Sequence, residues 1–379
     1  SAYHHGEVSL ENTIVNLAQT FVGSNNVNLL VPSGQFGTRL QGGKDHAAAR
    51  YIYTRLHPAA RVFMHPDDDH VLEYLSDEGL SIEPRWYCPV IPMVLVNGSE
   101  GIGTGWSSSI PNYNPRDIIW NIEQTLQGKE MKAMMPWYRG FKGSVKKGPE
   151  EKKTDVKNAV TFLGSIEQTG DIEFEISELP VRVWTQTYKE FLDSVTKKKK
   201  DDDALLGGFV EHHTDDTVRF VLQVASEKMN GLSASAKMKA LMSKLKLSKP
   251  CSLDNMTLIS SDGTVKTYSS ALAILKEFCV VRLELYRKRK SYLVQRLAYD
   301  KEVLGSKTRF IEMVLKDELD LRGKKRAELL EQLKGAGFES MAEIKARLTI
   351  AVAEGQSPPE GEGGGAAAAS AAAKGGYEY

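Results

Sequence analysis

The dipeptide Arg50-Tyr51 is the clearest candidate for covalent chemistry in the sequence. It lies within "GGKDHAAARYIYT", residues 42–54, between small residues and a short stretch that could be helix or strand. A tyrosine hydroxyl can act as a nucleophile, but a phenol with a pKa of about 10 needs a base or a nearby positive charge at neutral pH. Most tyrosines in such a context are packing residues with a satisfied hydroxyl, so Tyr51 taken alone is interpreted as one.

A second candidate is the glycine-rich segment "EGIGTGW", residues 100–106. It lacks the Gly-Lys-Ser/Thr of a Walker A loop and the spacing of a GxGxxG loop, which excludes a nucleotide site here. Its alternating glycines allow a tight bend, so we expect a hairpin-like turn that carries the apolar side chain of Ile102. Ile102 could pack into the core or act as a wedge between base pairs, and the residues alone favour the core.

Two adjacent histidine pairs, His4-His5 and His212-His213, are weaker candidates. Neighbouring histidines rarely bind one metal without partners at a spacing such as HExxH, so no metal site is predicted. We expect the first pair to be buried and hydrogen-bonded, and the second to lie on an exposed strand or turn.

The composition excludes several classes of protein. The 379 residues contain 49 Lys+Arg and 49 Asp+Glu, so nucleic-acid affinity would have to come from local basic patches. The three cysteines lack CxxC spacing, which argues against disulfides or zinc and favours a reducing intracellular compartment. No apolar run approaches the ~20 residues of a membrane span, and no secretion signal is present. The chain begins in patterned sequence, as an internal fragment would.

Three regions must position these residues. In the first, "SLENTIVNLAQTF" has helical spacing with Ser9 as the expected N-cap, and residues 23–44 are expected to form loops and short extended pieces. The second, which reaches to about residue 268, is mixed α/β. Its β-branched runs include residues 94–96, "AVTFLGSIE", "IEFEISELP" and "VRFVLQV".

Within the second region, "TKKKKDDDALLGG" is a block of four Lys followed by three Asp that we interpret as a solvated, mobile loop, with a nuclear-import signal as the alternative. The third region is helical for more than forty residues. Its apolar positions step by seven, which predicts a coiled-coil arm or a dimer. They are Leu272, Cys279, Tyr286 and Leu293 and, continuing the step one turn over, Leu297, Leu304 and Ile311. The final Gly/Ala/Pro/Glu segment is expected to be a disordered tail.

The motifs become decisive in combination. The motifs are "YHHGE" (Tyr3 to Glu7), "GQFGTR" (Gly34 to Arg39), "GGKDHAAARYIYT" (Gly42 to Thr54), "NGSEGIGTGWS" (Asn97 to Ser107) and "ISELPVRVWTQTYK" (Ile176 to Lys189). Together and in this order they resemble the DNA breakage-reunion region of eukaryotic type IIA DNA topoisomerase (topoisomerase II), over residues 1 to about 345. Bacterial relatives share the Arg-Tyr pair and the isoleucine turn, but "HHGE" and "RYIYT" resemble the eukaryotic branch more.

The resemblance implies that Tyr51 is the active-site nucleophile. In that family its hydroxyl attacks a DNA phosphate and leaves a 5′-phosphotyrosyl enzyme and a free 3′-hydroxyl, so that resealing needs no external energy. Arg50 would stabilise the phosphoryl transition state, and His5 would assist at the scissile phosphate.

The DNA-binding residues also follow from the resemblance. Ile102 matches the residue that intercalates and bends DNA, which overturns the expectation that it is buried. The expected contacts to DNA around it are Lys44, Arg39, Gln35 and His4.

The same resemblance implies an α+β multidomain architecture. It consists of an N-terminally truncated winged-helix domain (1–88), a tower domain (89–268), a coiled coil leading to an exit gate (269–350) and a low-complexity tail (351–379). The implied activity is ATP-dependent passage of double-stranded DNA by a homodimer in the nucleus, with no membrane partner. The ATPase part and the acidic Mg²⁺ ligands would lie outside this chain, and so would the returning helix of the coiled coil. We therefore expect the isolated chain to bind DNA without cleaving it.

Two other functions stay open at this point. One is a winged-helix architectural dimer that binds DNA and never cuts it. The other is a tyrosine recombinase, whose chemistry needs a dispersed Arg/His constellation and leaves a 3′-linked phosphate.

Overall fold

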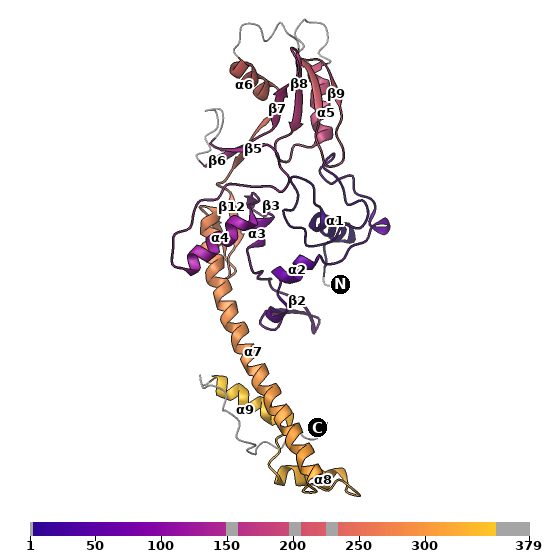
Figure 1. Ribbon diagram of the computed structural model, residues 1–379, viewed down its shortest axis with the longest axis vertical. Coiled ribbons are helices and arrows are strands. Elements are labelled where there is room, and N and C mark those ends of the chain that lie inside the picture. The colour runs from indigo at the N-terminus through magenta and orange to yellow at the C-terminus, as the bar shows by residue number, and fades with distance from the viewer. Residues whose placement is uncertain (1–2, 149–157, 197–205, 225–233, 354–379) are drawn as a thin grey trace. The chain divides into compact units, whose positions relative to one another are not determined.

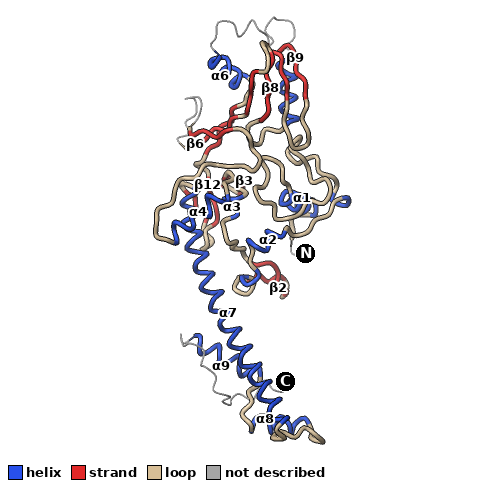
Figure 2. The backbone as a smooth tube through the Cα atoms, viewed as in Figure 1, coloured by secondary structure: helices blue, strands red, loops and turns tan. Residues whose placement is uncertain are grey.

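The computed structural model describes residues 3–148, 158–196, 206–224 and 234–353 (Figures 1 and 2). They combine helices with small antiparallel sheets and one long helix, which confirms the mixed α+β class. The chain divides into two compact units. Unit 1 comprises Ser1–Pro66 and Glu73–Arg282, and unit 2 comprises Asp67–Leu72 and Leu283–Tyr379. The boundaries at residues 88 and 268 stay predictions.

Helix α1 (Glu7–Ala18) opens unit 1 and confirms the predicted helix. The expectation that Ser9 is its N-cap is wrong, because the helix begins two residues earlier, after Gly6 at φ 88°. Inside the helix, the carbonyl of Ser9 accepts a hydrogen bond from Thr13 Oγ1, and the Ser9 hydroxyl lies 2.8 Å from the Tyr3 hydroxyl. Residues 23–44 form loops with isolated bridges, as predicted.

The rest of the first region is built from short elements. They are η1 (Ala49–Tyr51), α2 (Pro58–Phe63), η2 (Pro66–Asp68), β1 (Tyr74–Asp77) and β2 (Leu80–Pro84). Strands β1 and β2 pair antiparallel.

The segment Met93–Val96 corrects the strand expected at residues 94–96, because it forms the short helix α3. Leu95 and Val96 are fully buried in a core of unit 1, so tertiary burial overrides the β propensity of these residues. Strands β3 (Ser99–Gly103) and β4 (Trp106–Ile110) then form an antiparallel hairpin, and α4 (Pro115–Leu126) follows.

The predicted strand runs of the second region form two sheets, with orders β7-β8-β10-β9 and β11-β6-β5. The strands are β5 (Ser144–Lys147), β6 (Ala159–Leu163), β7 (Ser165–Gln168), β8 (Glu173–Glu178), β9 (Leu206–Glu211), β10 (Phe220–Val224) and β11 (Ser248–Ser252). Helices α5 (Thr185–Thr196) and α6 (Ala234–Lys244) bury leucines against the four-stranded sheet. The charged residues 197–203 of the predicted loop lie outside the described residues.

Helix α7 (Ala271–Leu315) confirms the long helix. It follows the hairpin of β12 (Met256–Ile259) and β13 (Val265–Tyr268), and its first turns are buried in the same core as α3 and α4. In unit 2, the end of α7 packs with α8 (Arg326–Gly335) and the residues around it through Leu319, Leu333 and Phe338.

Helix α9 (Met341–Ala353) runs three residues into the segment predicted as a tail, whose boundary at residue 351 stays a prediction. Residues 354–379 lie outside the described residues. The apolar seam of α7 at Leu297, Leu304 and Ile311 is exposed, so its pairing with another helix stays a prediction. Within the described ranges, no helix is both long and apolar enough to cross a membrane.

Candidate nucleic-acid interface and active site

Tyr51 lies at the end of the single-turn helix η1, with 67% of its surface exposed. Its backbone N–H donates to the carbonyl of Ala48 at 2.9 Å, which closes the turn. The next side chain, Ile52, points the other way and packs on the small core formed by Val15, Ala18 and Phe36. The two neighbouring side chains therefore have opposite roles: the Tyr51 ring faces solvent, and Ile52 anchors the turn on the core.

Backbone hydrogen bonds fix this turn on both sides. After it, Ser33 and Tyr53 exchange N–H···O bonds of 3.1 and 3.0 Å. Before it, the N–H of Ala47 donates to the carbonyl of Gln35 at 2.9 Å. The residues between these anchors form a short, pinned protrusion, so the position of the Tyr51 hydroxyl is set by the backbone.

Arg50 brings a positive charge to the tyrosine. Its guanidinium carbon lies 4.9 Å from the centroid of the Tyr51 ring, and both side chains are exposed. A guanidinium at this distance is attracted to the face of the ring, and its N–H groups can still meet a phosphate. Arg50 and Tyr51 therefore form a unit suited to attack on a phosphodiester.

The expectation that His4 and His5 are buried is wrong, because both are exposed in the segment that precedes α1. The His5 ring meets the Tyr3 ring edge-on at 5.5 Å, and His4 Nε2 lies 3.6 Å from Asp77 Oδ2. The contacts in the described chain do not bring His5 to Tyr51. Their predicted roles at DNA stay predictions.

The second histidine pair lies at the end of β9. His212 is exposed, as expected for a strand end or turn. His213 is half-buried, with its ring 5.4 Å from that of Phe220 and its Nε2 3.8 Å from Glu211 Oε2.

The loop before η1 carries three predicted DNA contacts, of which two are exposed. Gln35 accepts a hydrogen bond from the N–H of Gly37 at 3.0 Å, and Lys44 extends from the far end of the loop. Asp45 closes the loop by accepting a hydrogen bond from the N–H of Thr38 at 2.8 Å. Gln35 and Lys44 therefore stand on a closed loop whose ends are fixed.

Arg39, the third of these residues, points into unit 1. It is 3% exposed, and its guanidinium forms an ion pair with the buried carboxylate of Glu178. Glu178 also accepts hydrogen bonds from the N–H groups of Lys142 and Leu179, at 3.0 and 2.8 Å. This geometry gives Arg39 an internal structural contact and does not favour its predicted contact with DNA.

Ile102 is 93% exposed at the end of the β3–β4 hairpin. It pairs with Ser107, and Gly103 pairs with Trp106 across a two-residue turn. The hairpin-like turn is confirmed, and the interpretation from the residues alone that Ile102 lies in the core is wrong. The register explains this, because the core ends at Ile110 and the strands continue beyond it into solvent.

Two asparagines that sequence reasoning missed, the half-buried Asn97 and the fully buried Asn112, tie this hairpin to the first region. Asn97 precedes β3 and forms two hydrogen bonds with the backbone of Val27, at 3.0 and 2.8 Å. Asn112 follows β4 and donates to the carbonyl of Ser24 at 2.9 Å. Partners 70 and 88 residues apart leave no local pattern, so no signal in the sequence could have found these contacts.

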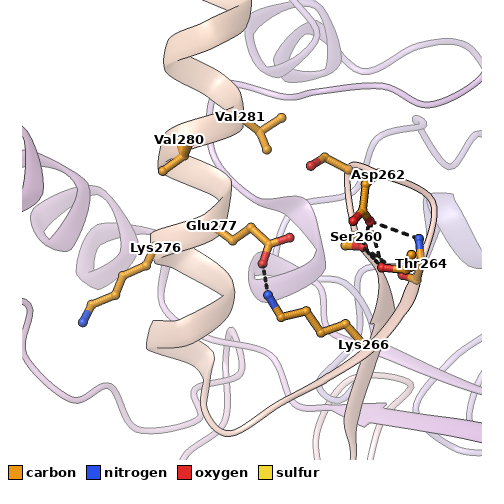
Figure 3. A pocket seen from close by; sticks show the side chains of 9 residues that line it. Ser260, Asp262, Thr264, Lys266, Lys276, Glu277, Val280 and Val281 are labelled. Atoms are coloured by element: carbon orange, nitrogen blue, oxygen red, sulfur yellow. Dashed lines mark hydrogen bonds and ion pairs between the residues drawn. The ribbon is translucent and has the colours of Figure 1, made fainter.

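A pocket of about 470 Å³ opens between the β12–β13 turn and α7 (Figure 3). Hydrogen bonds from Ser260 and then Thr264 lower the pKa of Asp262 to about 2. Lys266 Nζ lies 2.6 Å from Glu277 Oε2. Lys266 and Glu277 thus pair with each other, Asp262 is held by Ser260 and Thr264, and the pocket shares no residue with the predicted site. In the part of the chain that the structure describes, no three His, Cys, Asp or Glu side chains gather as metal ligands.

Comparison with known proteins decides the family. The family model for the A-type subunits of DNA gyrase and topoisomerase IV matches residues 1–354. The chain belongs to this family. A DNA topoisomerase 2 from Pisum sativum is 48% identical over 342 residues, which make up 90% of this chain and 23% of that protein. DNA topoisomerase 2-alpha from Mus musculus is 43% identical over 341 residues, 90% of this chain and 22% of its own length.

A solved structure supports the same family assignment. The Plasmodium falciparum topoisomerase II DNA-binding, cleavage and re-ligation domain superposes with a TM-score of 0.83 at 42% identity, covering 91% of this chain and 45% of that one. These matches confirm the predicted resemblance to topoisomerase II, so the chain corresponds to a part of a type IIA topoisomerase. It spans less than a quarter of the length of these two curated relatives.

Proposed function

We propose that this chain is the DNA-gate part of a topoisomerase II, which breaks and rejoins double-stranded DNA through Tyr51. The observation that carries the proposal is the pinned turn, which exposes the Tyr51 hydroxyl beside the Arg50 guanidinium. An exposed, fixed tyrosine next to a cation suits covalent catalysis better than packing.

The reaction begins with attack by the Tyr51 oxygen on a backbone phosphorus. The O–P bond to tyrosine forms and the bond from phosphorus to the 3′ oxygen breaks. The phenol proton is lost to a base or to solvent, and the leaving 3′ oxygen takes up a proton to become a hydroxyl. Arg50 stabilises the charge on the non-bridging oxygens during this transfer. His5 assists at the same phosphate once DNA is bound. Attack by the free 3′-hydroxyl on the phosphotyrosine reverses each bond change and reseals the strand.

Ile102 supplies the bend in the DNA. A bare isoleucine at the end of a paired hairpin can enter between base pairs, where the cost of unstacking is offset by the contacts that the bent duplex makes. Lys44 and Gln35 contact the backbone from the loop beside the turn, and His4 adds a contact near the N-terminus. Arg39 supports that loop from within through Glu178.

The complete protein acts as a nuclear homodimer that passes one duplex through another with ATP. In it, two Tyr51 residues cut opposite strands. The winged-helix, tower and coiled-coil domains correspond to residues 1–88, 89–268 and 269–350. As the resemblance to topoisomerase II implies, we assign the binding of Mg²⁺ and ATP to other parts of that protein.

The test is denaturant trapping of the full-length protein on end-labelled duplex DNA with Mg²⁺, followed by mapping of the attached peptide. We expect DNA linked to Tyr51 through its 5′ phosphate. A 3′ linkage would instead support a recombinase mechanism, and stable binding with no linkage at all would support an architectural protein.

A further inference from the structure

The two predicted DNA-contacting features of unit 1, the Tyr51 turn and the Ile102 hairpin, are distant in sequence but joined by a specific contact. The Asn97 side chain pairs with the backbone of Val27 as a strand would. Its Oδ1 accepts from the N–H of Val27 at 3.0 Å, and its Nδ2 donates to the carbonyl of Val27 at 2.8 Å. Both hydrogen-bonding groups of one residue's backbone are thereby occupied by one amide.

A second amide secures the same join. Asn26 is 3% exposed, and its Nδ2 lies 2.9 Å from the carbonyl of Val96 and 3.1 Å from that of Tyr113. Its Oδ1 accepts from the N–H of Arg139 at 2.8 Å. Val96 precedes the hairpin and Tyr113 follows it. Asn26 therefore holds both ends of the hairpin against the segment that contains Val27.

That segment leads directly to the tyrosine. The carbonyl of Leu29 accepts from the N–H of His57 at 2.9 Å, and the N–H of Val31 donates to the carbonyl of Arg55 at 2.9 Å. The exchange between Ser33 and Tyr53 completes this antiparallel ladder, two residues from Tyr51. A series of hydrogen bonds therefore links the start of the hairpin to the segment that follows Tyr51.

We propose that Asn97 is a positioning residue that fixes the Ile102 wedge relative to the Tyr51 hydroxyl, so that the DNA bend falls at a set number of base steps from the phosphate that is cut. The proposal rests on the proposed function of Tyr51 and Ile102. Asn97 touches neither DNA nor the reacting atoms. It acts through the backbone of Val27. Tyr51 and Ile102 contact the same duplex at two separate places, so the segments that carry them must be held rigidly together.

The chain contains a matched control in Asn121. Its amide is 1% exposed and clamps the backbone of Lys132 in the same way, with Oδ1 accepting at 2.7 Å and Nδ2 donating at 3.2 Å. It secures α4 to the following loop and lies outside the ladder that leads to Tyr51. Because Asn121 is more buried than Asn97 and also donates to the carbonyl of Asp117, Asn121→Ala should lose at least as much stability as Asn97→Ala while the two variants differ in their effect on cleavage.

The experiment compares these two variants in the full-length protein with Mg²⁺, on a duplex carrying one preferred cleavage site. With Asn97→Ala we expect the covalently trapped fraction at Tyr51 to fall about tenfold and the cut phosphates to spread over neighbouring steps. DNA affinity should stay within about twofold, because backbone contacts supply most of it. Asn121→Ala should cut at the original phosphate. If Asn97→Ala keeps the cleavage pattern of Asn121→Ala, the proposal is overturned.

Two further measurements keep the outcomes separate. Asn97→Asp keeps the acceptor for the Val27 N–H but replaces the donor by a charged oxygen facing the Val27 carbonyl, so it should show the same spread of cut phosphates and gives a second test if Asn97→Ala does not fold. Spin labels at the exposed positions 53 and 104 report the distance between the Tyr51 turn and the Ile102 hairpin without any cleavage. Asn97→Ala should broaden the distribution of this distance more than Asn121→Ala does. If that broadening occurs but the parent protein forms no Tyr51 adduct, the proposed function fails. If the parent forms the adduct and the distance stays narrow, only the positioning role fails.

Discussion

Two glycine-rich stretches of unit 1 look alike in sequence and differ in what their glycines do. In the loop of residues 37–43, a Cβ added to Gly42 would lie 2.3 Å from the Trp184 ring, and one on Gly43 would lie 2.2 Å from the Gln19 amide. In the hairpin, a Cβ on Gly101 would meet nothing within 4 Å. The loop needs glycine because other chain segments press against it, whereas the hairpin glycines leave open space around Ile102.

This difference matches the proposed roles. A nucleophile must be held in place, and the loop beside Tyr51 is packed and closed. A wedge must protrude, and the hairpin beyond its core residue Ile110 is bare. The glycines of the loop thus allow close packing that holds it in place, whereas the glycines of the hairpin leave Ile102 accessible to a ligand. The following variants test that contrast.

The largest effect is expected at Arg39, within the packed region. Arg39→Ala leaves the carboxylate of Glu178 buried without its ion-pair partner, which should cost about 3–5 kcal/mol of stability. Lys44→Ala, on the exposed side of the same loop, should change stability by less than about 0.5 kcal/mol and lower the salt dependence of DNA binding by about one ion. Denaturant unfolding and DNA titrations at several salt concentrations measure both. Equal stability of the two variants would mean that the loop is not held from within.

The next largest effect is expected at Gly42, in comparison with Gly101 of the hairpin. Gly42→Ala places a side chain at φ 65° and against Trp184, so strain and overpacking together should cost about 3 kcal/mol. Gly101→Ala should change the free energy of unfolding by less than about 0.5 kcal/mol. Thermal melts of both variants provide the comparison, and a Gly101→Ala melt as low as that of Gly42→Ala would remove the contrast.

A smaller effect on stability, but a clear one on DNA, is expected at the hairpin. Ile102→Ala removes an exposed side chain, so unfolding should be unchanged within about 0.5 kcal/mol. The bend of a doubly labelled duplex, followed by FRET, should shrink, and cleavage should fall more than affinity because phosphate contacts supply most of the binding energy. A variant that bends DNA as well as the parent would show that Ile102 is not the wedge.

Local pattern was sufficient for much of the fold. Helical spacing predicted α1 and α7, and β-branched runs predicted the strands around residues 159–178. It failed where distant residues decide the outcome. Residues 94–96 are helical because the core buries them, and α1 begins at Glu7 because Gly6 turns the chain there.

The candidate site shows the same limit. The motif resemblance selected Tyr51, Arg50 and Ile102, and all three side chains are exposed. Arg39 could not be placed from its motif, because its partner Glu178 lies 139 residues away. Contacts of this length depend on tertiary packing, which no short motif encodes.

The central claim is that the Tyr51 hydroxyl is the nucleophile, and its most direct test is Tyr51→Phe in the full-length protein. This variant keeps the ring beside Arg50 and removes one oxygen, so DNA affinity should stay within about twofold of the parent. We predict that denaturant trapping with Mg²⁺ yields no DNA covalently attached to the variant, while the parent yields a 5′-linked adduct at Tyr51. A covalent adduct that persists in Tyr51→Phe would contradict the account.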